Sequence, residues 1–316
     1  MDGDRWLVKG AWGFSPLYIM AFNLVLNSNN VVSGTNNNTY RYNFISNSFT
    51  LLDDAEICVS SIQIPYSWYN VSTAYGNTKI QLIWPNLTTG ITPYSITLAE
   101  GFYQVVDLNA AIQQFCINNG LYLINSLGQN VFYLTLLLNL SSYGVQLISY
   151  AIPTSLPSGY SQPSNFAGFY ATSLSPQLII PTTSTFGNLI GFATGTFPTT
   201  NISSFYSVLN TFVPLGSNIN SLIIRCSLVD NQVGVPTDIL DTMPVTSTFG
   251  SNINYQPPIE KWIKLCGGVH QSLSITFVDQ NLNAVIALDS NVCISLLINN
   301  KGKPVQRIIE KLNIRS

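Results

Sequence analysis

Residues 272–285 read SLSITFVDQNLNAV, an alternating run followed by a short polar segment. Leu273, Ile275 and Phe277 are separated by serine and threonine, so apolar and polar side chains point to opposite faces of an extended strand. Residues 221–229 show the same alternation, with Leu222, Ile224, Cys226 and Leu228 on one face. Such strands pack one face on a core and expose the other, which is typical of an antiparallel sheet.

The polar segment 279–283 could be a turn or the start of a calcium loop. Asp279 and the two asparagines that follow have the spacing of the first calcium ligands. The pattern then fails, because Ala284 stands where the loop needs glycine and Ser290 stands where it needs glutamate. Asp and Asn commonly bond their own backbone in turns. The sequence therefore predicts a turn between two strands and no metal site.

The composition predicts a subunit that neighbouring molecules cover. Only 8% of the 316 residues are charged, the formal net charge is −2, and hydrophobic residues make up 46%, whereas about a quarter of an ordinary chain is charged. A sparsely charged surface gives weak self-repulsion and poor solubility. Apolar runs are too short for a membrane-spanning helix. The five scattered cysteines are expected to be buried free thiols in a reducing compartment such as a cytosol.

Short β-branched or alternating runs recur between clusters of Gly, Pro, Asn and Ser, which indicates a sandwich or barrel. We expect strands near 39–45, 55–64, 79–84, 93–98, 131–138, 144–150, 221–229, 259–265, 270–278 and 291–298, with a β-bulge at Ser60–Ser61. One helix is predicted after Asp107 as its N-cap, ending at Asn119, and a short helical turn is predicted near 186–192.

These elements predict an all-β fold, a single jelly-roll β-sandwich with additional β elements inserted between its halves and few short helices. We divide the chain into an N-terminal extension or arm at 1–35, a jelly-roll domain at 36–299 and a basic C-terminal tail at 300–316. The inserted β region is expected at about 120–215.

Motifs of catalysis are missing from the sequence. His270 is the single histidine. Cys266 precedes it by four residues, but an exposed histidine at a strand edge is favoured over a Cys–His nucleophile pair. Most carboxylates stand beside turns or helix starts, where they act as caps. We therefore expect no enzyme, no catalytic residue, no cofactor and no small-molecule substrate. A β-sandwich glycosidase is a remote alternative, because sequence alone does not show which carboxylates meet.

Two aromatic residues just past a predicted strand are candidate contact residues. Trp68 and Tyr69 could form an exposed platform that stacks on a sugar or a base, and on a sugar it would suit a glycan-binding or receptor-binding adhesin. The favoured alternative is that these side chains close the end of the sandwich or bury against a neighbouring subunit.

The C-terminal tail concentrates the positive charge. Five of the twelve basic residues lie there, namely Lys301, Lys303, Arg307, Lys311 and Arg315. After Pro304, the apolar residues Val305, Ile308, Ile309 and Leu312 fall on one face of a predicted short helix. Because so short a helix is marginal alone, we expect it to dock on a neighbour, an inner membrane surface, the genome or its own domain.

Several motifs in a fixed order give a family resemblance. They are MAFNLVLNSNNVV (20–32), TYRYNF (39–44), AEICVSSIQIPYSWYN (55–70), ITLAEGFYQVVDLN (96–109), FGNLIGFATGTFP (186–198) and SITFVDQN (274–281). In this order they resemble the minor capsid or penton proteins of virophages, Polinton-like elements and large DNA viruses. The resemblance runs from about Met20 to Ile298, and residues 1–19 have no counterpart in it.

The resemblance implies a jelly-roll virion protein without catalytic activity, made and folded in the host cytoplasm. It implies five copies that close an icosahedral vertex and contact capsomers of the major capsid protein. The alternatives are a glycan-binding β-sandwich and a different minor capsid protein, such as a cement protein.

Overall fold

The computed structural model describes residues 19–45 and 48–301, which divide between two units. The first unit combines Met1–Ser67 with Asn220–Ser316, and the inserted unit is Trp68–Ile219. The chain therefore leaves the first unit once and returns to it once. None of the helices in these described residues is long and apolar enough to cross a membrane.

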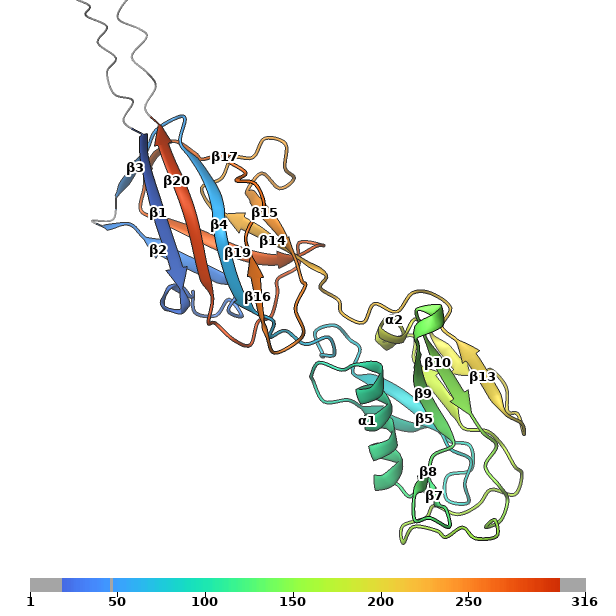
Figure 1. The fold of residues 1–316 in the computed structure, drawn as a ribbon. Helices are drawn as coiled ribbons and strands as arrows, with labels where there is room; N and C mark the ends of the chain where they lie inside the picture. The colour runs from blue at the N-terminus through green and yellow to red at the C-terminus, as the bar shows by residue number, and fades with distance from the viewer. Residues whose placement is uncertain (1–18, 46–47, 302–316) are drawn as a thin grey trace, which may run out of the picture. The chain divides into compact units, whose positions relative to one another are not determined.

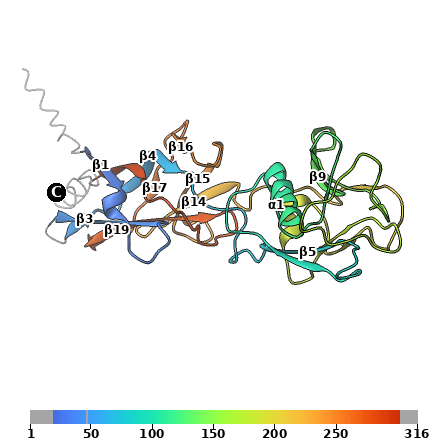
Figure 2. The same ribbon diagram turned by 90° about the horizontal axis from the view of Figure 1, so that it is seen from below.

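The first unit contains two main sheets, which Figure 2 shows as two layers, with β4 and β16 in one and β14 and β19 in the other. Sheet A has the order β1 (Ile19–Asn27), β20 (Cys293–Lys301), β4 (Glu56–Pro65) and β16 (Asn252–Tyr255), and β17 (Ile263–Lys264) also pairs with β4. Sheet B has the order β15 (Ile239–Pro244), β14 (Ser221–Cys226), β19 (Ser272–Asp279) and β2 (Thr39–Asn43). A small ladder joins β3 (Phe49–Leu51) to β18 (Gly268–His270), and the 3-10 turn η1 (Ser28–Asn30) follows β1.

The eight main strands of this unit pair in nested order. The first pairs with the eighth (β1 with β20), the second with the seventh (β2 with β19), the third with the sixth (β4 with β16) and the fourth with the fifth (β14 with β15), all antiparallel. Figure 1 shows β1, β20 and β4 side by side. This double Greek-key winding is that of a jelly roll. The predicted all-β jelly-roll class is thus confirmed.

The predicted alternation explains how the two sheets form a core. Ile224 of β14 lies opposite Phe277 of β19, and both side chains are buried. In sheet A, β20 pairs Ser295 with Ser61 but Leu296 with Val59, which leaves Ser60 as an extra residue. The predicted β-bulge at Ser60–Ser61 is therefore confirmed.

The inserted unit has two further sheets and most of the helix. One sheet has the order β12 (Gly195–Phe197), β11 (Gln177–Ile180), β5 (Lys79–Ile83) and β6 (Tyr94–Thr97), and the other has the order β13 (Tyr206–Leu209), β10 (Gly144–Ser149) and β9 (Leu134–Asn139). A short ladder pairs β7 (Leu123–Ile124) with β8 (Asn130–Val131). The helical elements are α1 (Val105–Asn118), α2 (Phe186–Ile190) and the 3-10 turn η3 (Leu140–Ser142).

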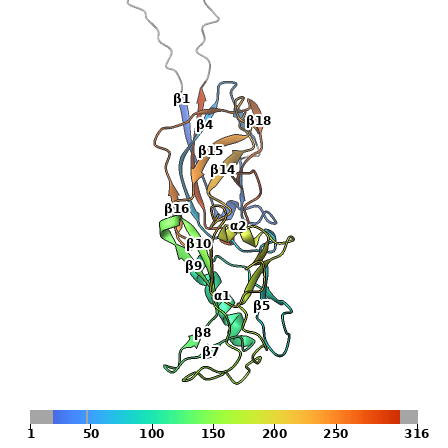
Figure 3. The same ribbon diagram turned by 90° about the vertical axis from the view of Figure 1, so that its right-hand side faces the viewer.

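The inserted unit has a hydrophobic core of its own. Leu108 and Ile112 of α1 belong to the same buried cluster as Leu82 of β5 and Leu136 of β9. Figure 3 accordingly shows α1 between β5 and β9. Because this cluster consists of residues from the inserted unit alone, the unit can bury its apolar surface without the jelly roll.

The predicted helix ends as expected but begins earlier. Gln104 is the N-cap, and Asp107 lies in the first turn, where its Oδ2 accepts a hydrogen bond from the Gln104 N–H at 2.9 Å. The predicted N-cap at Asp107 is therefore wrong. At the other end, Gly120 has φ +65°, and an added Cβ would lie 2.0 Å from the Asn165 carbonyl oxygen. The predicted short helical turn is confirmed as α2.

Three boundaries differ from those expected. The inserted unit begins at Trp68 rather than near residue 120, because β5, β6 and α1 pack on its core. Part of the expected arm at 1–35 forms β1, whose Leu24 and Leu26 are buried. The strand expected near 259–265 is reduced to the two residues of β17.

Asn70 holds together the two ends of the inserted unit. Its Nδ2 donates to the carbonyl oxygens of Gly216 at 2.7 Å and Tyr103 at 2.8 Å, and its Oδ1 accepts from the Tyr103 N–H at 2.8 Å. The side chain is buried, with an exposed fraction of 1%. Because a buried amide keeps these backbone groups paired, its loss leaves several of them without partners.

We expect Asn70→Ala to destabilise the inserted unit by about 3 kcal/mol, since three buried hydrogen bonds are lost. Urea denaturation followed by circular dichroism measures this change. Asn201→Ala, at an exposed position of the same unit, is the control and should leave the midpoint unchanged. Equal midpoints for the two variants would contradict the role assigned to Asn70.

Candidate assembly surfaces

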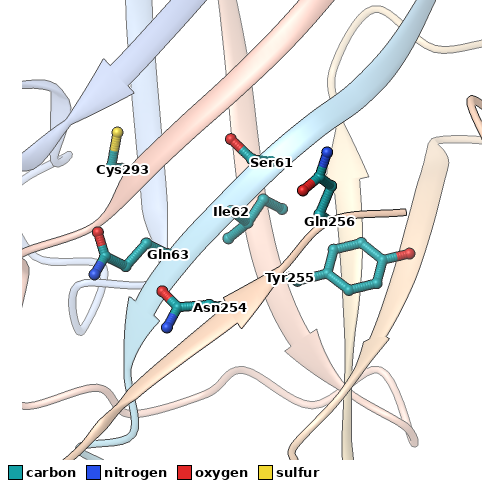
Figure 4. A pocket seen from close by; sticks show the side chains of 7 residues that line it. All are labelled: Ser61, Ile62, Gln63, Asn254, Tyr255, Gln256 and Cys293. Carbon is teal, nitrogen blue, oxygen red and sulfur yellow. The ribbon is translucent and has the colours of Figure 1, made fainter. Parts of the chain in front are cut away.

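The outer face of sheet A carries a row of uncharged polar side chains. Strand register places Cys293 of β20, Gln63 of β4 and Asn254 of β16 directly across from one another. Figure 4 shows Gln63 and Asn254 side by side. With Ser61, Ile62, Tyr255 and Gln256 they line a shallow groove of about 430 Å³, which we call the amide groove.

All seven residues that line the amide groove are uncharged. Side-chain amides both donate and accept hydrogen bonds, so a face built from them can pair with another polar protein surface. Protein interfaces combine about ten such direct hydrogen bonds with bridging water. The groove is therefore chemically suited to a protein contact.

A buried carboxylate joins the two sheets beside this groove. Asp241 of β15 in sheet B accepts hydrogen bonds from the Tyr255 hydroxyl of β16 in sheet A at 2.8 Å and from Lys261 Nζ at 2.7 Å. Asp241 is 6% exposed. Burial, followed by the neighbouring Asp241 carboxylate, raises the pKa of Tyr255 to about 12. The three groups close this edge of the sandwich.

The inserted unit is almost free of charge. Its 152 residues include only three charged side chains, those of Lys79, Glu100 and Asp107. Large apolar side chains nevertheless reach its surface, with Leu140 82% exposed and Leu87 80% exposed. Single exposed apolar residues are common, whereas apolar residues that lie together on a surface mark sites of protein contact.

Part of this apolar surface forms a groove at the tip of the β9–β10 hairpin. Leu138, Leu140 and Tyr143 line it together with Val105 and Pro214, and its volume is about 290 Å³. We call it the hairpin-tip groove. Leu138 is 58% exposed and Tyr143 is 76% exposed, so the groove presents apolar groups that water covers only at a cost in free energy.

The residues predicted to form a turn do so. Asp279 Oδ1 accepts hydrogen bonds from the backbone N–H groups of Asn281 and Asn283, both at 2.8 Å. The carboxylate is thus held by its own turn. The turn does not form a hairpin, because β19 belongs to sheet B and β20 to sheet A. Within the described residues, no group of three or more His, Cys, Asp or Glu side chains could hold a metal ion.

His270 ends β18 and is partly buried. Its Nε2 lies 2.8 Å from the Cys266 carbonyl oxygen, so this contact of the ring is with the backbone of residue 266 and not with its thiol. The strand-edge position agrees with the prediction, and the exposure is lower than expected. This geometry does not support a Cys–His nucleophile.

The expected contact residues are only partly described by the structure. Trp68 is 1% exposed and Tyr69 is partly buried, so Trp68 does not offer an open ring face for stacking on a sugar. Of the basic tail, Lys301 is the last residue of β20. Lys303, Arg307, Lys311 and Arg315 lie outside the described residues, and the roles expected for them stay predictions.

Sequence reasoning missed both grooves. The amide groove combines three strands that are far apart in the chain, and β16, which supplies Asn254, was not predicted. The hairpin-tip groove similarly combines the start of α1, the β9–β10 hairpin and a loop near Pro214. The scarcity of charge between Trp68 and Ile219 was a sequence signal for the hairpin-tip groove, but the amide groove lies outside this segment.

Comparison with known proteins gives two similar solved structures. The mavirus penton protein is 10% identical with a TM-score of 0.45, over 90% of this chain and 100% of that chain. A chain in the structure of the Sputnik virophage is 10% identical with a TM-score of 0.38, over 90% of this chain and 98% of that chain. No protein-family model and no curated protein matches the sequence.

We expect Tyr255→Phe to lower the free energy of unfolding at pH 7 by about 1–2 kcal/mol, because Asp241 loses a hydrogen bond. Folding raises the pKa of Tyr255 from 10.0 to about 12. The protonated hydroxyl of Tyr255 therefore contributes fully to the free energy of unfolding below pH 10, and this contribution is lost as the pH rises through 12. The difference in free energy of unfolding between wild type and variant, measured by urea denaturation, should become smaller between pH 10 and 12. A gap that stays constant over this range would contradict the link to Asp241.

The cysteines give a second test of the structure. Cys266 and Cys293 are exposed, whereas Cys58, Cys116 and Cys226 are buried. Burial raises the pKa of Cys58 to about 11 and those of Cys116 and Cys226 to about 12, which suppresses the reactive thiolate.

Ellman's reagent at pH 8 should therefore modify Cys266 and Cys293 in the native chain, and the three buried thiols only after unfolding. Cys293→Ser should remove one of the native-state reactions. Rapid reaction of Cys226 in the native chain would show that the core of the jelly roll is not closed.

Proposed function

We propose that this chain is a structural virion protein, a penton subunit at the vertex of an icosahedral capsid. In this proposal five copies form a ring, and the ring contacts capsomers of the major capsid protein. The protein acts through the contacts that its surfaces make with neighbouring subunits, and it uses no catalytic residue or cofactor. It resides in the virion after synthesis in the host cytoplasm.

The observation that carries the proposal is the scarcity of charge on a jelly roll with an inserted unit. Charged side chains make up 8% of the chain and number three among the 152 residues of the inserted unit. A surface of this kind is poorly protected against association. In a shell the same surface is an advantage, because neighbouring copies remove it from water without having to desolvate charges.

The two ends of the jelly roll differ, which suits a subunit with an inner and an outer side. Ile19 and Lys301 pair with each other, so both ends of the described chain lie at one end of sheet A. Pro65 lies at the opposite end of sheet A, beside Asn252, and the connection to the inserted unit follows it.

The amide groove is the contact that we assign to the ring. A cyclic ring needs heterologous contacts, in which one surface of a copy meets a different surface of the next copy. A stable contact of this type buries about 800 Å² on each partner, which is larger than the groove itself. Gln63 and Asn254 would then lie within a wider polar interface and fix its register through hydrogen bonds.

We expect electron microscopy of the purified chain to show five-fold rings. Gln63→Lys and Asn254→Lys should reduce the ring population in sedimentation velocity, because each places an unpaired charge on the contact face. Val233→Lys is the matched control, since Val233 is 95% exposed on the loop between β14 and β15.

Rings should also protect Cys293 from thiol reagents, because this residue lines the amide groove. A chain that remains monomeric at high concentration and binds glycans on an array would overturn the proposal. Rings that form equally well in the Gln63→Lys and Val233→Lys variants would overturn the assignment of the contact face.

A further inference from the structure

The jelly roll is open along one flank. β1 is the last strand of sheet A and β2 is the last strand of sheet B, and a groove of about 240 Å³ lies where these two edges meet. Its lining is largely apolar and includes Phe22, Leu24, Tyr42, Phe44, Phe49 and Ile298. We call it the flank groove.

Aromatic rings build one wall of the flank groove. The rings of Phe44 and Phe49 stack with centroids 4.9 Å apart, and Phe22 meets Phe49 edge-on at 5.4 Å. Beside them Ile45, which also lines the groove, is 83% exposed. Phe44 is itself only 7% exposed and Phe49 is partly buried, so the ordered rings form the floor of the groove and Ile45 is its open apolar rim. Burial of this rim would be favourable.

The chain itself carries a segment that matches this surface. Ile298 of β20 lines the groove, and the described chain ends three residues later at Lys301. Residues 302–316 follow directly, with the apolar face Val305, Ile308, Ile309 and Leu312 that the sequence predicts for a short helix. A helix over residues 304–312 would be about 13 Å long, and so short a helix needs a partner surface to be stable.

The distribution of charge also favours binding of residues 302–316 to the rest of the chain. Residues 19–301 contain six basic and eleven acidic side chains, a net charge of −5, whereas residues 302–316 contain four basic and one acidic side chain, a net charge of +3. Asp53 and Asp54 are exposed just beyond β3, whose Phe49 lines the groove. The end of β3 is tied to β20, because Asn300 Oδ1 accepts from the Leu52 N–H at 2.9 Å. Negative charge thus lies close to the point from which the tail departs.

We propose that residues 302–316 bind the flank groove of their own chain. The apolar face of the tail covers Ile45 and the partly exposed ring of Phe49, and its basic side chains remain toward solvent and toward Asp53 and Asp54. Binding buries apolar area beside β1 and β2, which would otherwise favour association with other molecules. This docking is independent of ring formation, so it can be tested on the dilute, unassembled chain.

A disulfide trap in the full chain tests the proposal. Cys266→Ser and Cys293→Ser first remove the two exposed thiols. Ile45→Cys is then combined with Ile309→Cys, and mild oxidation should yield a disulfide within one chain. The matched control combines Val233→Cys with Ile309→Cys, because Val233 is also exposed but lies beside the opposite edge of sheet B.

A docked tail raises the effective concentration of the two thiols, so the Ile45 pair should form at least about ten times more intrachain disulfide than the control pair. Equal yields for the two pairs would overturn the proposal, and so would a disulfide that forms only between two chains. Either result leaves the ring assignment untouched, because the experiment is done below the concentration at which rings form.

Hydrogen exchange gives a readout that does not depend on disulfide geometry. Ile308→Asp with Ile309→Asp should abolish docking and speed exchange of the backbone amides of Tyr42 and Phe44 several-fold relative to wild type. Val233→Asp is the control and should leave these amides unchanged. Unchanged exchange in the tail variant would overturn the proposal. The proposal would also be overturned if the backbone amides of the tail were protected from exchange only when anionic vesicles or DNA are added. That result would assign the tail to a membrane or to the genome.

Discussion

The jelly roll depends on the pairing of its first strand with its last. β1 and β20 match over nine residue pairs, from Ile19 opposite Lys301 to Asn27 opposite Cys293. β20 lies between β1 and β4, so sheet A has no continuous hydrogen-bonded ladder until the final strand is in place. Contacts of such long sequence separation cost loop-closure entropy before they contribute any stability. Sheet A therefore requires both ends of the first unit before it is complete.

The inserted unit makes this requirement easier to meet. It interrupts the chain between β4 and β14, the third and fourth main strands, and would act as a very long loop if it were unfolded. Its own buried cluster lets it fold separately, and Asn70 ties its entering segment to Gly216 near its exit. The two connections are then held near each other, which shortens the effective loop that the jelly roll must close. A single buried amide within the inserted unit thus also lowers the entropy cost of strand pairing in the jelly roll.

How much of this could be predicted from sequence differs from element to element. β14 and β19 were predicted because one face of each is buried and the other is polar, which gives a clear period of two. β16, with the sequence NINY, was missed because its four residues show little apolar contrast. The start of the inserted unit was misplaced because alternation reveals a strand without revealing which core the strand packs against. Burial of Trp68 and the row of Cys293, Gln63 and Asn254 follow from tertiary register, which no local pattern contains.

The distribution of charge connects the fold with the proposed assembly. The inserted unit and the amide groove present hydrogen-bonding groups and apolar groups with almost no ionised ones, and positive charge is concentrated in the last sixteen residues. Contacts made by such surfaces depend on shape and on directional hydrogen bonds, which act over short distances, whereas charge acts over about 10 Å at moderate ionic strength. In the proposed ring, identical copies would have to meet in one register, and long-range attraction between uniform charges would not distinguish that register from others. Short-range polar contacts on a rigid sheet face would distinguish it, so a nearly uncharged contact face suits the proposed assembly.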